Sequence, residues 1–584
     1  MAVEKLIVDH IDTWSTALQT RSTAGRGSSG KINLYGIKKL RELILELAVR
    51  GKLVPQDPND EPASELLKSI AAEKAELVKQ GKIKKQKQLP EISEEEKLFE
   101  LPEGWEWTRL INLGTWALGS GFPNAVQGGS DKEILMCKVS DMNLEGNEKF
   151  IVSTINTISK DLADEYKIKI SEPGTIIFPK IGGAIATNKR RILVQETAID
   201  NNCLGIKPCN AISGEWFYLI LSALDMSKYQ SGTSIPAINQ SVIGSIPIAL
   251  PSLKMQEKIL SYVITLMSLC DQLEQHSLTS LDAHQQLVET LLTTLTDSQN
   301  ADERAESWAR ISEHFDTLFT TEASIDALKQ TILQLAVMGK LVPQNPNDEP
   351  ASELLKRIAQ EKSQLVKDGK IKKQKPLPPV SDEEKPFELP DGWEWSRLDH
   401  VATKITDGDH KTPPRIAEGY KLLSAKNIRD GFLDYENCDY ISESSYIKSR
   451  ERCLPEKGDL LIVSVGGTIG RSSLITGDSE FALVRSVAII KPLIIEPNFL
   501  KIAMDSQLLQ SMIHSHKRGG AQPCLYLGEI SKFRFPVPPL KEQKRIVNTV
   551  NIFMEILETL TLAFKSAQQT QLHLADALTD AAIN

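Results

Sequence analysis

One stretch of this sequence occurs twice, and that duplication constrains the fold more than any other feature. The first copy runs from Ile44 to Leu110 and the second from Ile332 to Leu398, at an offset of 288 without a gap. Of the 67 aligned positions, 52 are identical. Identity at this level indicates internal duplication, so we expect two halves built on one plan and packed about a pseudo-twofold axis.

Each copy begins with a helical pattern. Residues 36–50 place apolar side chains on one helical face, and Gly51 is suited to ending that helix. A second helix is expected after residue 60, with an apolar stripe that both copies share. The stripe consists of Leu66, Leu67, Ile70 and Leu77 in the first copy and Leu354, Leu355, Ile358 and Leu365 in the second. The basic run at 82–87 invites a nucleic-acid interpretation, but a solvated connector is the simpler one.

The regions that follow the two copies lose the helical period. Residues 108–250 and 396–537 show short apolar runs broken by Gly, Pro and Asn, which predicts strands. The expected strands include 134–136, 174–178 and 203–206 in the first region and 422–423, 459–463 and 487–490 in the second. Landmarks correspond: Gly182-Gly183 with Gly466-Gly467, Lys207-Pro208 with Lys491-Pro492, Pro236 with Pro523, and Pro251 with Pro538. We therefore expect one scaffold with different loops.

Each strand-rich region ends in a proline-rich strand that leads into a long helix. Both helices carry apolar residues at alternating spacings of four and three, the pattern of a coiled-coil seam. The seam residues are Ile259, Val263, Leu266, Cys270 and Leu273 in the first helix and Ile546, Val550, Phe553, Leu557 and Leu560 in the second. We expect these seams to pair with each other, and helices of some 40 residues to span about 60 Å. Packing of each helix on its own domain is the alternative.

The expected fold class is mixed α+β, with two globular domains separated by long antiparallel helices. The expected boundaries are 1–103 for an N-terminal helical region (first repeat copy from about 36), 104–251 for the first globular domain, 252–391 for a central long helix with the second repeat copy, 392–538 for the second globular domain and 539–584 for a C-terminal long helix. No apolar run approaches the ~18–20 residues needed to cross a bilayer, and the N-terminus lacks a signal peptide. The seven cysteines are scattered without a Cys-x-x-Cys pair, which fits a reducing cytoplasm and predicts no metal site.

Charge alone does not indicate a nucleic-acid partner. The formal net charge is −9, yet residues 108–250 hold 13 Lys/Arg against 13 Asp/Glu, and residues 396–537 hold 19 against 17. The strand-rich regions are therefore near neutral. Any DNA-binding surface must be local and made by basic loops.

Motifs of catalysis are missing. The sequence contains no Gly-x-Ser-x-Gly, no His-Glu-x-x-His and no [Asn/Asp]-Pro-Pro-[Tyr/Phe]. Residues Gly25 to Lys31 match part of a phosphate-binding loop, but Ile32 replaces the required Ser or Thr, so residues 22–30 are interpreted as a linker. We predict no catalytic residues in this chain.

The strand-rich regions do carry polar and basic residues at expected turns. Arg and Lys can contact guanine or phosphates, and Asn and Gln can pair with adenine. The candidates are Lys180, Thr187, Asn188, Lys189, Arg190, Arg191, Asn239 and Gln240 in the first region and His410, Lys411, Thr412, Lys426, Asn427, Arg429, Arg471, Arg485, Lys517, Arg518 and Gln522 in the second. For any one of these, a solvated loop residue is the simpler interpretation, but the set together predicts DNA contact.

These features together resemble the specificity subunit of a type I restriction-modification system. The resemblance rests on the duplicated Leu-Pro-x-Gly-Trp-x-Trp entry, the Gly519-to-Pro523 turn, the helix 332–342 and the exit Pro538-Pro539-Leu540-x-Glu542-Gln543. The first exit departs from the pattern, because Met255 stands where Glu542 does. This departure weakens residue-level inference at that junction only.

The resemblance implies two target-recognition domains, each reading one half of a split, asymmetric DNA site. It further implies that the helices set the spacer and dock two modification subunits, which would methylate adenine N6 with S-adenosylmethionine after flipping the base. Restriction subunits would add ATP- and Mg-dependent translocation and cleavage. This chain would itself need no cofactor and would have no membrane partner.

A helical scaffold that joins proteins without reading DNA sequence is the alternative function. Such a scaffold has no need of two inserted domains that differ while their frame is nearly duplicate, so this divergence favours the DNA reader. A single-chain restriction enzyme is disfavoured by the missing motifs. The DNA sequence recognised, the spacer length, the adenines methylated and whether the complex also restricts are left open by the sequence.

Overall fold

The computed structural model describes residues 3–20, 32–85, 89–232, 236–373, 375–477, 480–520 and 522–583. The Ser22–Gly30 linker and the segment that resembles a phosphate loop lie outside these residues. The chain divides into two compact units. Within the described residues, unit 1 is built from residues 3–19, 32–278 and 570–583, and unit 2 from residue 20 and residues 279–569.

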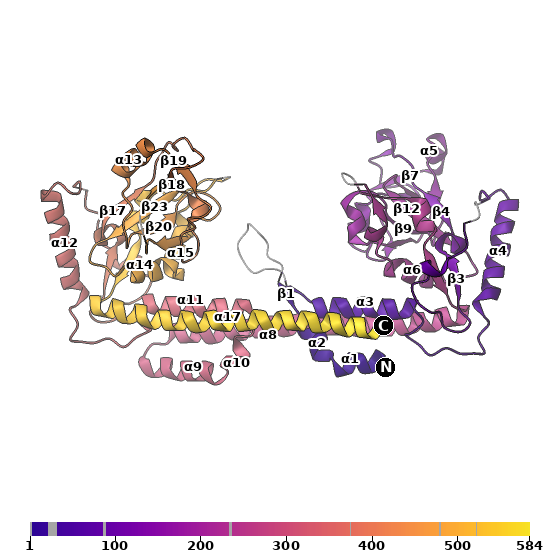
Figure 1. Cartoon of the computed structure of the whole chain (residues 1–584), viewed down its shortest axis with the longest axis horizontal. Helices are drawn as coiled ribbons and strands as arrows, with labels where there is room; N and C mark the ends of the chain where they lie inside the picture. Colours follow the sequence, from indigo (N-terminus) through magenta and orange to yellow (C-terminus); the bar gives the residue numbers. More distant parts are fainter. Residues whose placement is uncertain are drawn as a thin grey trace. The chain divides into compact units, whose positions relative to one another are not determined.

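The helical frame of unit 1 precedes and follows a strand-rich domain (Figure 1). Its elements are α1 (Val3–Asp9), α2 (Ile11–Thr16), β2 (Ile32–Asn33, paired with β1, Gln19–Thr20), α3 (Tyr35–Val49), α4 (Ala63–Lys79), the first part of α8 (Leu253–Asp297) and the end of α17 (Leu540–Ile583). The predicted face of α3 is buried, including Leu40, Leu43 and Ile44. Gly51 ends α3 as predicted, with φ +66, and a Cβ there would lie 2.6 Å from Pro102 Cγ.

Domain 1, from β3 to β15, is a mixed α+β domain with two main sheets. Its strands are β3 (Glu106–Arg109), β4 (Gly114–Leu118), β5 (Ile134–Cys137), β6 (Phe150–Ile151), β7 (Asn156–Ile158), β8 (Ile170–Ser171), β9 (Ile176–Pro179), β10 (Arg191–Leu193), β11 (Thr197–Ile199), β12 (Cys203–Pro208), β13 (Gln230–Ser231), β14 (Ala237–Ile238) and β15 (Pro247–Leu250). Its helices are α5 (Lys160–Glu165), α6 (Gly214–Ala223) and α7 (Gln240–Gly244). The sheets have the orders β4-β12-β9-β10-β6 and β7-β5-β11-β8.

Unit 2 repeats this plan. Its helical frame consists of the end of α8, α9 (Ala301–Glu313), α10 (Phe315–Leu318), α11 (Glu322–Val337), α12 (Ala351–Lys367) and the first part of α17. The duplication extends upstream of the repeat, because His10-Ile11-Asp12-Thr13 at the start of α2 matches His314-Phe315-Asp316-Thr317 at the start of α10. The offset there is 304 rather than 288, so the first half carries an insertion before α3.

Domain 2, from β16 to β24, has the same sheet topology as domain 1. Its strands are β16 (Glu394–Arg397), β17 (Ala402–Asp407), β18 (Tyr420–Leu423), β19 (Asp439–Ile441), β20 (Leu460–Val463), β21 (Ser472–Leu474), β22 (Phe481–Leu483), β23 (Val487–Pro492) and β24 (Arg534–Val537), and its helices are α13 (Glu443–Arg452), α14 (Pro497–Asp505), α15 (Gln507–His516) and α16 (Leu527–Lys532). The orders β17-β23-β20-β21 and β19-β18-β22 match those of domain 1 without β6 and β8. The six predicted strands are all present, as β5, β9, β12, β18, β20 and β23.

Each domain is closed at its base by its entry and exit strands. The Trp-x-Trp entry strand β3 pairs antiparallel with the proline-rich exit strand β15, and β16 pairs in the same way with β24. The long helices α8 and α17 begin three residues after these exit strands, at Leu253 and Leu540. The duplicated sequence motifs therefore form the point where the chain enters and leaves each domain.

The two long helices run antiparallel within each unit. In unit 1, Lys258 near the start of α8 binds Asp60, which follows the C-terminal end of α3. Arg41 inside α3 binds Glu274 farther along α8, so α3 and α8 run antiparallel. Lys39 of α3 binds Asp576 of α17, and Lys52 donates to the carbonyl of Ile583, so α17 runs with α3 and against α8. In unit 2, Lys340 after α11 binds the end of α8 at Thr296, whereas Glu322 at the start of α11 binds Lys565 of α17.

The predicted seams are largely buried but lie in different units. Ile259, Val263, Leu266 and Cys270 are buried in unit 1, and Leu273 is half-buried. Ile546, Val550 and Leu557 belong to the core of unit 2, with Phe553 and Leu560 packed against it. That core contains Val288, Leu292 and Leu295 from the end of α8, together with α11. The expectation that the two seams pair with each other is therefore corrected: each seam packs in the core of its own unit.

One helix among the described residues is long and apolar enough to cross a membrane. An 18-residue window of α17 has a mean hydropathy of 1.3 and is 22% buried. Polar residues interrupt this window, so it contains no continuous apolar run of the length expected for a membrane-spanning segment. Core helices of soluble proteins meet the same criteria, and α17 supplies Ile546 and Val550 to the core of unit 2, so length and composition alone give no membrane assignment.

Candidate nucleic-acid interface

Three loops meet on a rim at one edge of each domain, held by the same backbone hydrogen bonds. In domain 1, Lys180 N donates to the Asn202 carbonyl, Ile238 N donates to the Lys180 carbonyl and Gly182 N donates to the Pro236 carbonyl. Domain 2 repeats these bonds from Ser464 N to Ser486, from Leu525 N to Ser464 and from Gly466 N to Pro523. A fourth loop joins the other three in each domain. Ser120 N donates to the Ile199 carbonyl in domain 1, and Asp409 N donates to the Leu483 carbonyl in domain 2. We call these loops rim 1 (residues 119–123, 180–189, 200–202 and the described part of 229–239) and rim 2 (408–414, 464–471, 484–486 and the described part of 517–526).

The two rims keep their backbone but differ in side chains. Lys180 corresponds to Ser464, Asn202 to Ser486, and Asn201 to Arg485. The duplicated scaffold therefore presents two different chemical surfaces at equivalent places, which is what a protein needs in order to read two different sequences.

Arg190 is the candidate that the structure moves away from the surface. Its side chain is 3% exposed, and its guanidinium donates to the carbonyls of Leu221 (3.0 Å), Lys189 (2.8 Å) and Leu224 (3.1 Å). It also lies over the Phe178 ring, 5.4 Å from the centroid. Burial lowers the pKa of Arg190 to about 10. With its donors occupied by the fold, Arg190 acts as a structural residue.

The neighbours of Arg190 are partly committed in the same way. Asn188 has a left-handed φ of 51, and its Oδ1 accepts from Arg190 and from the Met226 amide. The Thr187 hydroxyl donates to Ala184, and Lys189 binds Asn143. Arg191 is half-buried, donates to the Arg190 and Met142 carbonyls, and has a pKa lowered by burial. Of this run, Thr187 is exposed and Lys189 is half-exposed on the rim.

The remaining candidates of domain 1 differ in position. Lys180 is half-exposed at the centre of rim 1. Asn239 caps α7, because its side chain accepts from the Ser241 amide. Gln240 follows in the first turn of α7 and lines a cavity near the base of the domain, so it lies away from the rim.

Rim 2 gathers His410, Lys411, Thr412 and Arg485. All four are exposed. His410 Nε2 lies 3.3 Å from Asp407 and 2.7 Å from Arg452, while Arg452 also binds Asp407. Arg485 lies in the turn between β22 and β23, where its amide donates to Asp409. Arg452, on α13, is a member of this cluster that the sequence patterns missed, since nothing in the sequence links it to a loop 42 residues away.

A second loop of domain 2 holds Lys426, Asn427 and Arg429. Asn427 is fully buried, accepting from the Ser424 amide and donating to the carbonyls of Asp434 and Asn437, so it organises this loop. Lys426 is exposed and binds Asp439, and Arg429 lies 3.5 Å from Asp434. The equivalent position in domain 1 is Asp141, which is buried and accepts from the amides of Lys138 and Ile155.

The last four candidates lie at or near rim 2. Arg471 is half-exposed and follows the glycine turn 466–470. Lys517 and Gln522 are exposed, and Arg518 lies 3.7 Å from Glu529. The Arg518 and Cys524 backbones exchange hydrogen bonds, which fixes the base of this loop. The described residues therefore bring most candidates of domain 2 to one edge, whereas in domain 1 several are used by the fold.

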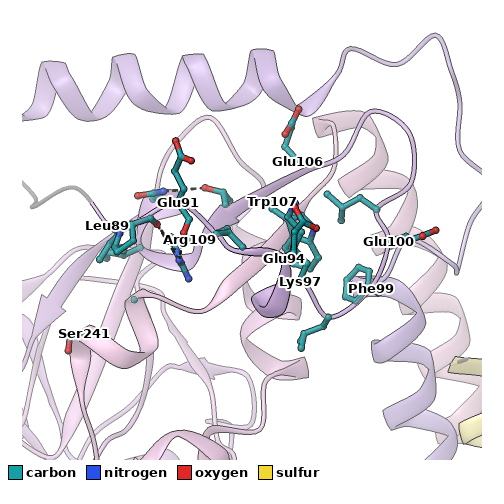
Figure 2. Close-up of a pocket in the computed structure, with 18 of the residues that line it drawn as sticks. Leu89, Glu91, Glu94, Lys97, Phe99, Glu100, Glu106, Trp107, Arg109 and Ser241 are labelled. Atoms are coloured by element: carbon teal, nitrogen blue, oxygen red, sulfur yellow. Dashed lines mark hydrogen bonds and ion pairs between the residues drawn. The ribbon is translucent and has the colours of Figure 1, made fainter.

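A cavity of about 1270 Å³ lies at the base of domain 1, between the entry strand and the segment 89–101, which we call the strap (Figure 2). Trp107 and Phe99 line it together with Glu91, Glu94, Glu100 and Glu106. The strap is held by Arg109, whose guanidinium binds Glu96 (2.5 Å) and the carbonyls of Pro90 and Glu91. Carboxylates repel phosphates, so this acidic cavity is not suited to DNA, in contrast to the rims.

Comparisons with known proteins decide the family. The model for the type I restriction modification DNA specificity domain matches residues 129–283 and 390–564, more than half of the chain. The chain belongs to the specificity-subunit family of type I restriction-modification systems. The specificity subunit of the type I restriction enzyme EcoAI from Escherichia coli is 50% identical to it, and that of EcoEI is 46% identical, each over 100% of both chains.

A solved structure from a study of complex assembly in a type I restriction-modification system has 16% identity and a TM-score of 0.44, covering 83% of this chain and 99% of its own. Specificity subunits are DNA-recognising, non-catalytic members of complexes that hold the methyltransferase and restriction subunits. Among the described residues, no group of three or more His, Cys, Asp or Glu could hold a metal ion.

Proposed function

We propose that this specificity subunit binds a bipartite, asymmetric DNA site, with residues 104–251 reading one half-site through rim 1 and residues 392–538 reading the other through rim 2. The observation that carries this is the pair of rims with the same backbone hydrogen bonds and different side chains. A duplicated frame holds two readers in equivalent positions, while different side chains favour different bases. Two half-sites on one face of DNA would lie about one helical turn apart, near 34 Å.

The residues proposed to contact DNA are those of the rims with exposed polar or cationic groups. In rim 1 they are Lys180, Thr187 and Lys189, and in rim 2 they are His410, Lys411, Thr412, Arg485, Lys517, Arg518 and Gln522. Arg471 adds a cation within rim 2, and Lys426 and Arg429 carry cations in the loop after β18, beside Asp439 and Asp434. Each can donate to phosphate oxygens or base edges.

The helical frame is proposed to dock two modification subunits, and through them the restriction subunits. The long helices expose apolar side chains, including Ile264 (66% exposed) in unit 1 and Ile552 (59%) and Ile556 (48%), one helical turn apart, in unit 2. Neighbouring exposed apolar residues on one helix face are suited to a protein partner. The partners would supply S-adenosylmethionine, ATP and Mg, and the complex would act in the cytoplasm.

The test is replacement of one reader. Residues 104–251 are exchanged for the corresponding domain of another specificity subunit, and the methylated sites of genomic DNA are mapped in cells that carry the modification subunits. We expect one half-site to change while the other half-site and the spacer persist. An unchanged site, or two changed half-sites, would contradict the proposal.

A point variant refines this test. Arg485→Ala should weaken binding at the half-site read by domain 2 by about fivefold to 150-fold, or about 1–3 kcal/mol, because rim 2 loses a cation that can contact the bases. Its effect is measured by competition binding with duplexes mutated in one half-site at a time. Equal loss at both half-sites would place Arg485 outside domain-specific reading.

A further inference from the structure

Each unit carries a groove between its repeat helix and its domain. In unit 1 the groove of about 410 Å³ lies between α4 and the start of domain 1. In unit 2 the groove of about 830 Å³ lies between α12 and the start of domain 2. We call them arm groove 1 and arm groove 2. Each arm groove lies within its own unit, and none of its lining residues belongs to rim 1 or rim 2.

The two arm grooves have the same apolar floor. Leu67, Ala71, Val78 and Ile83 line the first, and the equivalent Leu355, Ala359, Val366 and Ile371 line the second. None of these eight residues is buried. Packing of the arm helix on its domain is provided by Ile70 and Ile358, which are 2% and 1% exposed. Leu355 also packs against the core of unit 2, but none of the eight floor residues is itself a buried core residue.

The edges of both arm grooves carry basic residues. Lys84 and its equivalent Lys372 are exposed at the same place, and Lys367, Lys373 and Lys375 add charge to groove 2. Inside, Lys74 donates to the carbonyls of Ile111 and Gly114, and Lys362 donates to that of Asp399. Among the described residues that line groove 2, Asp399 is the single carboxylate and lies 3.5 Å from Lys362, so lysines outnumber carboxylates in this lining.

We infer that each arm groove receives an acidic, apolar segment of the modification subunit, one copy of that subunit per groove. An apolar floor favours a peptide over DNA, since phosphates make no favourable contact with Leu, Val and Ile. The lysines at the groove edge favour carboxylates. The same residues at two places, beside domains that have diverged, fit a partner present in two identical copies. This inference rests on the proposed function and adds a docking site beyond the long helices.

The first experiment identifies the occupant directly. A photo-crosslinking amino acid replaces Ala71 or Ala359 on the groove floor, and in controls it replaces Ser69 or Arg357, which are exposed on the opposite face of the same helices at 100° per residue. The full chain is assembled with purified modification subunit and duplex DNA. We expect both floor positions, and neither control, to crosslink to the same Asp/Glu-rich peptide of the modification subunit. Crosslinks to the duplex, or none above the controls, would overturn the inference.

The second experiment tests charge without touching the core. Lys84→Glu combined with Lys372→Glu should weaken binding of the modification subunit at least about tenfold, and the loss should shrink at high salt. The matched control is Lys68→Glu with Lys356→Glu, which reverses two equally duplicated, exposed lysines outside the grooves. Equal effects of the two pairs would overturn the inference. If the wild-type complex methylates a bipartite site and the groove variants bind the modification subunit normally, the groove assignment fails and the proposed function stands. If the wild-type complex methylates no bipartite site, the proposed function itself fails.

Discussion

Arg190 and Arg191 are neighbours in sequence, but their side chains have different environments. Both follow the glycine turn of domain 1, and both are types that contact DNA. The structure buries Arg190 among carbonyls and leaves Arg191 half-buried. Sequence pattern can place an arginine in a loop, but it cannot tell which side of the loop faces the core.

Replacement of Arg190 should therefore affect stability before DNA binding. We expect Arg190→Ala to lower the free energy of unfolding of domain 1 by about 3 kcal/mol, because three carbonyls lose their donor and a cavity opens. Denaturant melts followed by hydrogen exchange in 104–251 measure this. Arg485→Ala is the exposed control and should shift stability by less than about 0.5 kcal/mol. A variant of Arg190 that melts like wild type yet loses DNA binding would contradict the assignment.

The departure at Met255 has a structural counterpart at residue scale. In unit 2, Gln344 Nε2 donates to Glu542, a carboxylate that is 1% exposed and whose pKa is raised by burial. In unit 1, where Met255 replaces it, Gln56 Oε1 accepts from Trp105 Nε1 at 2.8 Å. The repeated glutamine thus uses its amide nitrogen as a donor to Glu542 in unit 2 and its amide oxygen as an acceptor from Trp105 in unit 1.

This comparison predicts that Glu542→Met is tolerated. Gln344 can accept from Trp393 as Gln56 does from Trp105, and burying a thioether avoids the desolvation of a carboxylate. We expect a change in unfolding free energy of less than about 1 kcal/mol by denaturant titration. Gln344→Leu is the informative companion, since it leaves the carboxylate without this donor and should cost about 2 kcal/mol. A larger loss for Glu542→Met than for Gln344→Leu would refute this account.

At the scale of elements, the strap and its repeat equivalent in unit 2, residues 377–389, are each held by one copy of a duplicated ion pair. Arg109 binds Glu96 in unit 1, and Arg397 binds Glu384 in unit 2 at 2.6 Å. The arginine, together with the Ser93 or Ser381 backbone amide, lowers the pKa of each glutamate to about 2. A carboxyl with a depressed pKa stabilises the folded form above its ordinary pKa of about 4.5, and this contribution is lost as the pH falls toward about 2.

The strap should therefore open in acid. We expect cleavage of residues 89–101 by pepsin to rise as the pH falls from about 4.5 to about 2. Glu96→Gln should leave the strap open across this whole pH range and flatten the pH dependence of cleavage, because the amide cannot carry the charge. Glu94→Gln is the control, since Glu94 binds only the surface Lys97 among the described contacts. Opening that follows the same curve in both variants would argue against the Glu96 pair.

Element positions followed the sequence patterns closely, whereas element partners did not. The helices α3 and α4 and six strands were predicted because periodicity and turn residues act locally. The seams of α8 and α17 were also buried, but in different units, since a heptad pattern records that a helix face is covered and not what covers it. The match between His10 and His314 was missed because the insertion before α3 breaks the offset of 288.

At the scale of the whole molecule, the two domains should be interchangeable units of reading. If residues 104–251 and 392–538 trade places, the duplicated entry and exit strands can receive either domain, because β3–β15 and β16–β24 form the same antiparallel pair. We expect the methylated site to keep the same two half-sites, order and spacer, because exchanging two readers related by a pseudo-twofold axis presents the same duplex site read from the other strand. Methylation mapping measures this, and a soluble exchanged protein that methylates a different bipartite site would contradict it.

The sequence by itself determined the duplication, the helices of the frame, the strand positions and the family, because each rests on local periodicity or on motifs repeated within the chain. Tertiary structure decided which polar residues face water. Arg190 and Asn427 became part of the core, Arg452 joined His410 from a distant helix, and the loops around Lys180 and Ser464 took equivalent backbone bonds. The physical reason is sequence separation. Burial and hydrogen bonding between distant segments depend on how the sheets pack, and a local sequence pattern does not contain that information.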